Sequence, residues 1–252
     1  MSSLRLASVA LSLFLAGCVS SGHVDPMKTI EGREQARDAY ISLGVGYLER
    51  GMTERAKQPL RQSLEIDPNS ADAHATLALT FQREMEYELA DQHYRKALSS
   101  RGSDARLLNN YGSFLFERER YPEALESFQK AAQDTMYGER SRVFENLGLT
   151  YLKLNRPDDA RKAFTRSLRL NSRQPRALLE MALLSYDAGD YPAANGYYGS
   201  FSQLAEQNAR SLLLGSRLAR VFGDRDRAAS LGLQLRRLYP GSPEYQQFLA
   251  EQ

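Results

Sequence analysis

Apolar positions along this chain follow a helical spacing in blocks that return every 34 residues, with one interval of 36. Within each block, apolar residues recur at three, four and seven places, which is the spacing of one face of an α-helix. The blocks begin near Arg37, Ala71, Ala105, Ser141, Pro175 and Ala209. The pattern therefore predicts an all-α chain built from six similar units.

Small and aromatic residues occupy fixed places in these blocks. Four residues after an alanine that allows close backbone approach comes a large aromatic residue: Tyr94, Phe128, Phe164 and Tyr198. The fifteenth residue of a block is Gly51, Asn155, Gly189 or Gly223, and these types tolerate the left-handed conformation that ends a helix. Pro122 and Pro192 stand where a second helix would begin without losing a hydrogen bond to proline. Each block thus predicts two helices joined by a tight turn.

This arrangement resembles the tetratricopeptide repeat, whose helix-turn-helix units stack on one another. The resemblance implies a right-handed superhelical solenoid of six repeats over residues 30–252. A short helix at 243–252, with Tyr245, Phe248 and Leu249 on one side, would cap its last open face. Gly215 and Gly232 stand where bulky residues would normally pack, so we expect the sixth repeat to be degenerate. Solenoids of this kind usually bind other proteins.

The first residues carry a different pattern. Residues 1–17 have one positive charge at Arg5 and an apolar stretch, and they end in Leu-Ala-Gly before Cys18, the only cysteine of the chain. This is typical of a bacterial secretory signal, is too short to span a bilayer stably, and resembles a lipobox. The resemblance implies cleavage before Cys18 and a lipid anchor on it with more than one acyl chain. The alternative is an ordinary signal peptide or buried helix with an incidental cysteine.

Residues 18–29 are rich in Ser and Gly, which predicts a flexible tether between lipid and solenoid. By resemblance to lipoprotein sorting, Val19 indicates the outer membrane, with the solenoid facing the periplasm. Loss of Arg5 with the signal lowers the formal charge from +2 to +1, so the chain has no overall preference for nucleic acid. The last block nevertheless gathers arginines at positions 210, 217, 220, 225, 227, 236 and 237. Either a solvated face or contact with acidic partners or anionic head groups would explain them.

The sequence contains only weak motifs for metal binding or catalysis. The three histidines, His23, His74 and His93, are not at metal-ligand spacing, and His74 falls on the buried side of a helix. Residues 127–130 match the S-x-x-K pattern of serine acylases, but Phe128 fills the aromatic place of the repeat and the companion motifs are missing. We therefore predict that the protein is not an enzyme and takes no metal, cofactor or small-molecule substrate.

Binding is then the expected activity. In the repeat family that the chain resembles, the first helices line a concave groove. The residues expected to point into it are Ile41, Val45, Leu48, Leu79, Arg83, Asn109, Phe116, Leu149 and Leu152. An apolar face exposed in a groove indicates a binding site unless something covers it. The alternative is that residues 27–36 fold over Ile41 and Val45 as an internal cap.

Lipobox, tether and six repeats together resemble the type IV pilus biogenesis lipoproteins, the secretin pilotins. Residues 37–44 (RDAYISLG) and 64–68 (LEIDP) fit that family better than a generic repeat. The resemblance implies an adaptor that binds a secretin subunit and promotes its outer-membrane localisation and multimerisation for pilus assembly and twitching motility. Two other roles stay open: a scaffold that docks peptidoglycan hydrolases, and a structural subunit of an outer-membrane protein insertion machine.

Overall fold

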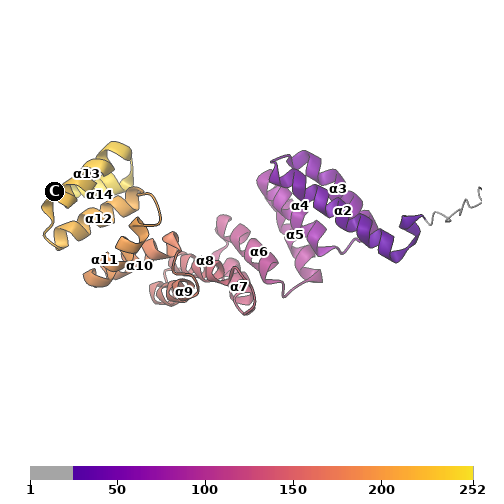
Figure 1. The fold of residues 1–252 in the computed structure, drawn as a ribbon, viewed down its shortest axis with the longest axis horizontal. Helices are drawn as coiled ribbons and strands as arrows, with labels where there is room; N and C mark the ends of the chain where they lie inside the picture. The colour runs from indigo at the N-terminus through magenta and orange to yellow at the C-terminus, as the bar shows by residue number, and fades with distance from the viewer. Residues whose placement is uncertain (1–24, 252) are drawn as a thin grey trace, which may run out of the picture. The chain divides into compact units, whose positions relative to one another are not determined.

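A computed structural model describes residues 25–251, and every regular element in that range is helical (Figure 1). The prediction of an all-α fold is confirmed. The elements are η1 (Pro26–Lys28), α2 (Ile30–Glu49), α3 (Thr53–Ile66), α4 (Ala71–Arg83), α5 (Tyr87–Ser100), α6 (Ala105–Glu117), α7 (Tyr121–Ala131), α8 (Arg140–Lys153), α9 (Pro157–Leu170), α10 (Pro175–Asp187), α11 (Tyr191–Ser202), α12 (Ala209–Val221), α13 (Arg225–Leu238) and α14 (Pro243–Ala250). The predicted signal, Cys18 and most of the predicted tether lie outside the described residues.

The chain divides into two compact units, and the boundary falls between Glu86 and Tyr87. Repeat counting alone predicts one continuous solenoid, whereas this boundary separates the two helices of the second block. Unit 1 contains η1 and α2 to α4, and unit 2 contains α5 to α14. Each unit has its own core.

In unit 1, α3 packs against both α2 and α4. Leu48, Ala56, Leu60 and Leu77 form the core of this three-helix group. Two ion pairs fix the helix ends: Arg37 on α2 reaches Asp67 after α3 at 3.5 Å, and Lys57 on α3 reaches Glu84 after α4 at 3.0 Å. The resulting position of α2 determines which of its side chains remain exposed.

Unit 2 is a series of helix pairs in which α6 packs with α7, α8 with α9, α10 with α11, and α12 with α13. Successive pairs are joined because α7 contacts α8, α9 contacts α10, and α11 contacts α12. The aromatic residues that the sequence places in these joints are all buried: Tyr94, Phe128, Phe164 and Tyr198. Contacts of α8 with both α6 and α10 set three first helices next to one another.

The turns inside the helix pairs have the expected backbone conformation. Gly51, Asn155, Gly189 and Gly223 all have φ between +55° and +77°, which confirms the prediction from residue type. Met85 and Glu119 hold the same place with φ of +62° and +59°. Their residue types gave no signal for a left-handed turn, since only Gly and a few polar residues adopt it readily.

The sixth helix pair is not degenerate, which corrects the expectation from its glycines. A Cβ on Gly215 would overlap the hydroxyl of Tyr198, and one on Gly232 would overlap the ring of Phe248. Tyr198 of α11 and Phe248 of α14 therefore fill the space that larger residues at 215 and 232 would occupy. Tyr245 and Phe248 of α14 pack on this core as expected, and Leu249 is 47% exposed. Figure 1 shows α12, α13 and α14 grouped together.

Replacement of Gly148 by alanine is expected to destabilise the protein. A Cβ there would lie 2.5 Å from the ring of Phe164, which is fully buried and has no room to move. Such overpacking costs about 1–3 kcal/mol, more than the ~1 kcal/mol by which alanine improves a helix. Urea denaturation followed by circular dichroism would measure the difference.

Gly196→Ala is the matched control, because Gly196 also lies within a helix of unit 2 but has no heavy atom within 4 Å of its Cβ position. It is expected to stabilise the protein by up to ~1 kcal/mol. A stabilising effect of Gly148→Ala of the same size would show that contact with Phe164 is not what requires glycine there.

Candidate partner-binding groove

The nine predicted groove residues divide between the two units. Five lie in unit 1, namely Ile41, Val45, Leu48, Leu79 and Arg83, and four lie in unit 2, namely Asn109, Phe116, Leu149 and Leu152. Each group is described within its own unit. A single groove that runs through both stays a prediction.

In unit 1 much of the predicted apolar surface belongs to the core. Leu48 is buried in the core cluster and Leu79 packs against that cluster, so Leu48 does not form an open face. Arg83 donates from Nη1 to the carbonyl of Leu48 and thereby satisfies the end of α2. Ile41 and Val45 are half-buried. Of the alternative cap at residues 27–36, residues 30–36 continue α2 as one helix and so do not fold back over Ile41 and Val45, while η1 before them contacts α2.

In unit 2 the predicted residues Phe116, Leu149 and Leu152 gather around two adjoining hollows. The first has a volume of about 220 Å³ and is lined by Ser113, Phe116, Glu117, Phe128, Asn146, Leu149 and Arg176. The second, of about 770 Å³, shares Phe116, Leu149 and Arg176 with it and extends past Leu152 and Leu179 to the loop before α12. We call these two hollows together the unit 2 groove.

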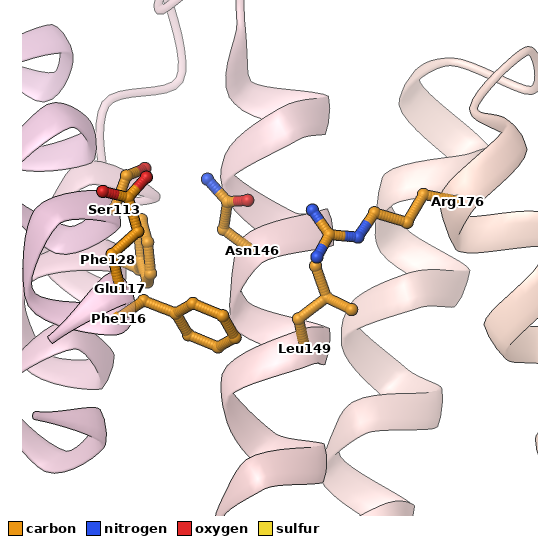
Figure 2. A pocket seen from close by; sticks show the side chains of 7 residues that line it. All are labelled: Ser113, Phe116, Glu117, Phe128, Asn146, Leu149 and Arg176. Carbon is orange, nitrogen blue, oxygen red and sulfur yellow. The ribbon is translucent and has the colours of Figure 1, made fainter. Parts of the chain in front are cut away.

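The floor of the unit 2 groove is apolar and firmly held. Leu149 is mostly buried and belongs to a core cluster with Ala160, Phe164, Ala177 and Met181. Phe116 packs against this cluster, and its ring meets Tyr121 edge-on at a centroid distance of 5.3 Å. Figure 2 shows the Phe116 ring and Leu149 facing each other across the hollow. An apolar side chain of a partner could enter between them without disturbing the fold.

An amide side chain lines the first hollow. Asn146 on α8 lines it, and its Nδ2 donates to Oδ1 of Asn109 on α6 at 3.1 Å. Asn109 itself is buried, so its role in the structure is to orient Asn146 rather than to face a partner. The sequence missed Asn146. Its one signal was its place in the row of first helices, next to Glu145, which holds the place of Asn109 one block later.

Charge is distributed unevenly around the groove. Arg176 of α10 reaches across toward Leu149, while Ser113 and Glu117 line the other side (Figure 2). The structure shows no salt bridge for Arg176 within residues 25–251. In contrast, Glu180 in the second hollow is held by Arg210 through two hydrogen bonds of 2.7 and 3.0 Å. The guanidinium of Arg176 is thus a cationic donor that is open to an incoming partner.

Arg176 also acts on a buried carboxyl group. Burial raises the pKa of Glu145 on α8, while the charge of Arg176 and the backbone N–H of Ala177 offset part of that rise. The carboxyl group of Glu145 therefore interacts with the start of α10. The site therefore combines an apolar floor, an amide, an exposed cation and a nearby carboxyl group.

Other candidate chemistry has a structural explanation. Ser127 of the S-x-x-K sequence is buried and donates to the carbonyl of Leu108 at 2.8 Å, while Lys130 pairs with Glu126. His74 is buried, and its Nε2 lies 3.0 Å from the carbonyl of Pro68. Among the described residues no cluster of three or more potential metal ligands occurs. Over the same residues, none of the helices has the length and hydropathy required to cross a bilayer.

Paired helices, left-handed turns, buried aromatic joints and a groove on the first helices define the tetratricopeptide-repeat class. The family model of this repeat matches residues 103–173. Along the whole chain, the sequence is 61% identical over 241 residues to the type IV pilus assembly protein PilF of Pseudomonas aeruginosa, and the match covers 96% of each chain. The chain therefore belongs to the PilF family of tetratricopeptide-repeat proteins.

Solved structures agree with this assignment. A structure of Pseudomonas aeruginosa PilF superposes with a TM-score of 0.84 at 62% identity, over 88% of this chain and 100% of that chain. PilW, described as a widely conserved type IV pilus biogenesis factor, superposes with a TM-score of 0.71 at 28% identity, over 85% of this chain and 99% of its own. The tetratricopeptide-repeat fold predicted from the sequence is confirmed.

Glu145→Gln is expected to change how stability depends on pH. Because the pKa of Glu145 is raised in the folded state, the folded chain binds this proton more tightly than the unfolded chain does. The group's contribution to stability is therefore largest below its unfolded pKa and declines as the pH rises through its folded pKa. Glutamine has nearly the same size and keeps a polar acceptor at this position but does not titrate.

The measurement is the free energy of unfolding of both proteins at pH 4 and pH 7. The variant is expected to gain stability relative to the wild type between these values. An unchanged difference would contradict the raised pKa. Arg176→Ala in the wild-type background removes a charge that opposes the rise, so it should enlarge the decline.

Proposed function

We propose that this chain is an outer-membrane lipoprotein adaptor, a pilotin that binds a secretin subunit and promotes its localisation and multimerisation during type IV pilus assembly. The observation that carries the proposal is the 61% identity to the type IV pilus assembly protein PilF over 96% of both chains. The secretin partner and the membrane location rest on the lipobox before Cys18 and on the repeat pattern, and these are interpretations of the sequence.

The unit 2 groove is the site that we assign to the partner. Repeat grooves of this kind hold an extended or helical segment, with apolar pockets for a few side chains and polar groups for the backbone. Here an apolar side chain would lie between Phe116 and Leu149, and Asn146 and Arg176 would bind main-chain or carboxylate oxygens. Burial of an apolar anchor in a rigid pocket supplies most of the affinity in such interfaces.

A lipid on Cys18 would explain how binding promotes assembly. Two or more acyl chains keep a protein stably at a membrane, whereas a single chain does so only marginally. A subunit bound to such a protein is confined to a thin layer beside that membrane. Its effective concentration there rises, and multimerisation is favoured without any new contact between subunits.

Cys18→Ala is expected to mislocalise or deplete the secretin multimer in cells, because the adaptor would bind subunits without an anchor. Membrane fractionation with a blot for heat-stable multimers would be compared in the wild type, in Cys18→Ala, and in cells that lack the gene. The deletion should abolish the multimer. Normal multimers at the outer membrane in the deletion strain would refute the pilotin role.

Arg176→Glu is expected to weaken binding to the purified secretin subunit by about tenfold, since reversing a cation in the interface replaces an attraction with a repulsion. Arg173→Glu is the matched control: it makes the same charge change three residues earlier, at an exposed position that does not line the groove. Titration calorimetry would measure both. Equal losses for the two variants would show that the groove is not the binding site.

A further inference from the structure

Positive charge is concentrated in the last block of the chain. Residues 209–252 carry seven arginines and four carboxylates, a formal charge of +3, while the remaining residues sum to −1 within the chain total of +2. The excess is therefore local. It lies on α12 and α13, whereas α14 carries only the carboxylate of Glu244.

Three of the seven arginines have structural partners. Arg210 holds the buried carboxylate of Glu180, and both Arg217 and Arg220 bind Glu251 after α14. These pairs tie α12 to α10 and to the end of the chain. They leave the four arginines of α13, at positions 225, 227, 236 and 237, without an ion pair in the part of the chain that the structure describes.

The stability of α13 gives little reason for arginine at these four positions. Arg225 and Arg227 lie in the first turn of α13, where the helix dipole disfavours cations. The dipole favours Arg236 and Arg237 in the last turn, but only by a small amount. Asp224 is the N-cap and accepts from the backbone N–H of Arg227, and Asp226, which lies between Arg225 and Arg227, forms no ion pair among the described residues. The side chains of all four arginines are exposed to solvent.

Apolar side chains are exposed among these arginines. The core fixes the orientation of α13, because Ala228, Leu231, Gly232 and Leu235 form its buried side. Leu233 then points outward and is 64% exposed, with Arg236 and Arg237 three and four residues further on along the same face. Leu238 at the end of α13 and Phe222 before its start are 54% and 52% exposed.

We propose that the exposed face of α13 binds the surface of an anionic lipid bilayer, with its guanidinium groups at the level of the phosphates and Leu233 at the acyl boundary. Guanidinium groups attract anionic head groups, and an exposed leucine between them adds apolar area that the acyl boundary can bury. Each arginine near such a surface adds to the attraction. An acidic peptide is a poorer fit, because the hollow beside Phe222 and Arg227 has a volume of only about 80 Å³.

A fluorophore at position 233 would test this contact directly. Cys18 is the only cysteine, so the full chain with Cys18→Ser and Leu233→Cys can be labelled at one place with a dye that reports an apolar environment. Vesicles of phosphatidylcholine with phosphatidylglycerol should shift its emission to the blue, and vesicles of phosphatidylcholine alone should not. Since the signal is local, membrane contact by the N-terminal residues does not produce it.

Arg236→Gln with Arg237→Gln should raise the phosphatidylglycerol concentration at half-maximal shift by about tenfold to thirtyfold. Arg169→Gln with Arg173→Gln is the matched control, because these arginines are exposed in unit 2 away from α13, and it should change little. Circular dichroism would verify that each variant is folded. Equal effects of the two pairs would overturn the proposal.

Three further results would also overturn it. The first is no shift with anionic vesicles, and the second is an equal shift from a dye at Leu170→Cys, which is exposed on α9. The third is a shift with polyglutamate but not with vesicles, which would assign the face to an acidic protein segment. Because Cys18→Ser removes the proposed anchor, these outcomes do not depend on the pilotin role.

Discussion

The structure depends on how closely the two helices of a pair approach each other. In α8 and α9 the aromatic ring of Phe164 lies against the backbone at Gly148, and Phe128 lies in the same way against Gly112. Any side chain at these glycines would push the helices apart. The approach fixes the rotation of each first helix about its axis. It thereby determines which side chains reach the core and which remain for a partner.

The unit 2 groove follows from that rotation. Once α8 is set against α9, Leu149 falls at the edge of the core and Asn146 falls on the open side, while Glu145 turns under the start of α10. The apolar floor is thus an extension of the core rather than a separate surface. A partner that fills the groove would bury more of the apolar surface that already holds the helix pairs together. A repeat fold can in this way form a binding site without a dedicated loop.

Much of the fold could be predicted from the sequence, because small, aromatic and turn residues recur at the same positions in each repeat. Tyr94, Phe164, Gly189 and Asn155 could be placed correctly from spacing and residue type. The turn at Glu119 could not, since its conformation is imposed by the helices on either side. The residues that line the groove could be predicted less well than the fold. Leu48 and Asn109 have the right spacing but are buried, and Arg176 lies at a helix start that the spacing rule did not include.

The contact between Gly232 and Phe248 joins positions that are far apart in the sequence. The ring on α14 occupies the space in which the side chain of residue 232 would lie, so the two positions share one volume. A larger residue at 232 requires a smaller one at 248, or a different path for the last helix. Among relatives of this chain, these two positions should therefore not vary independently, and the length of the chain after α13 should be constrained together with them.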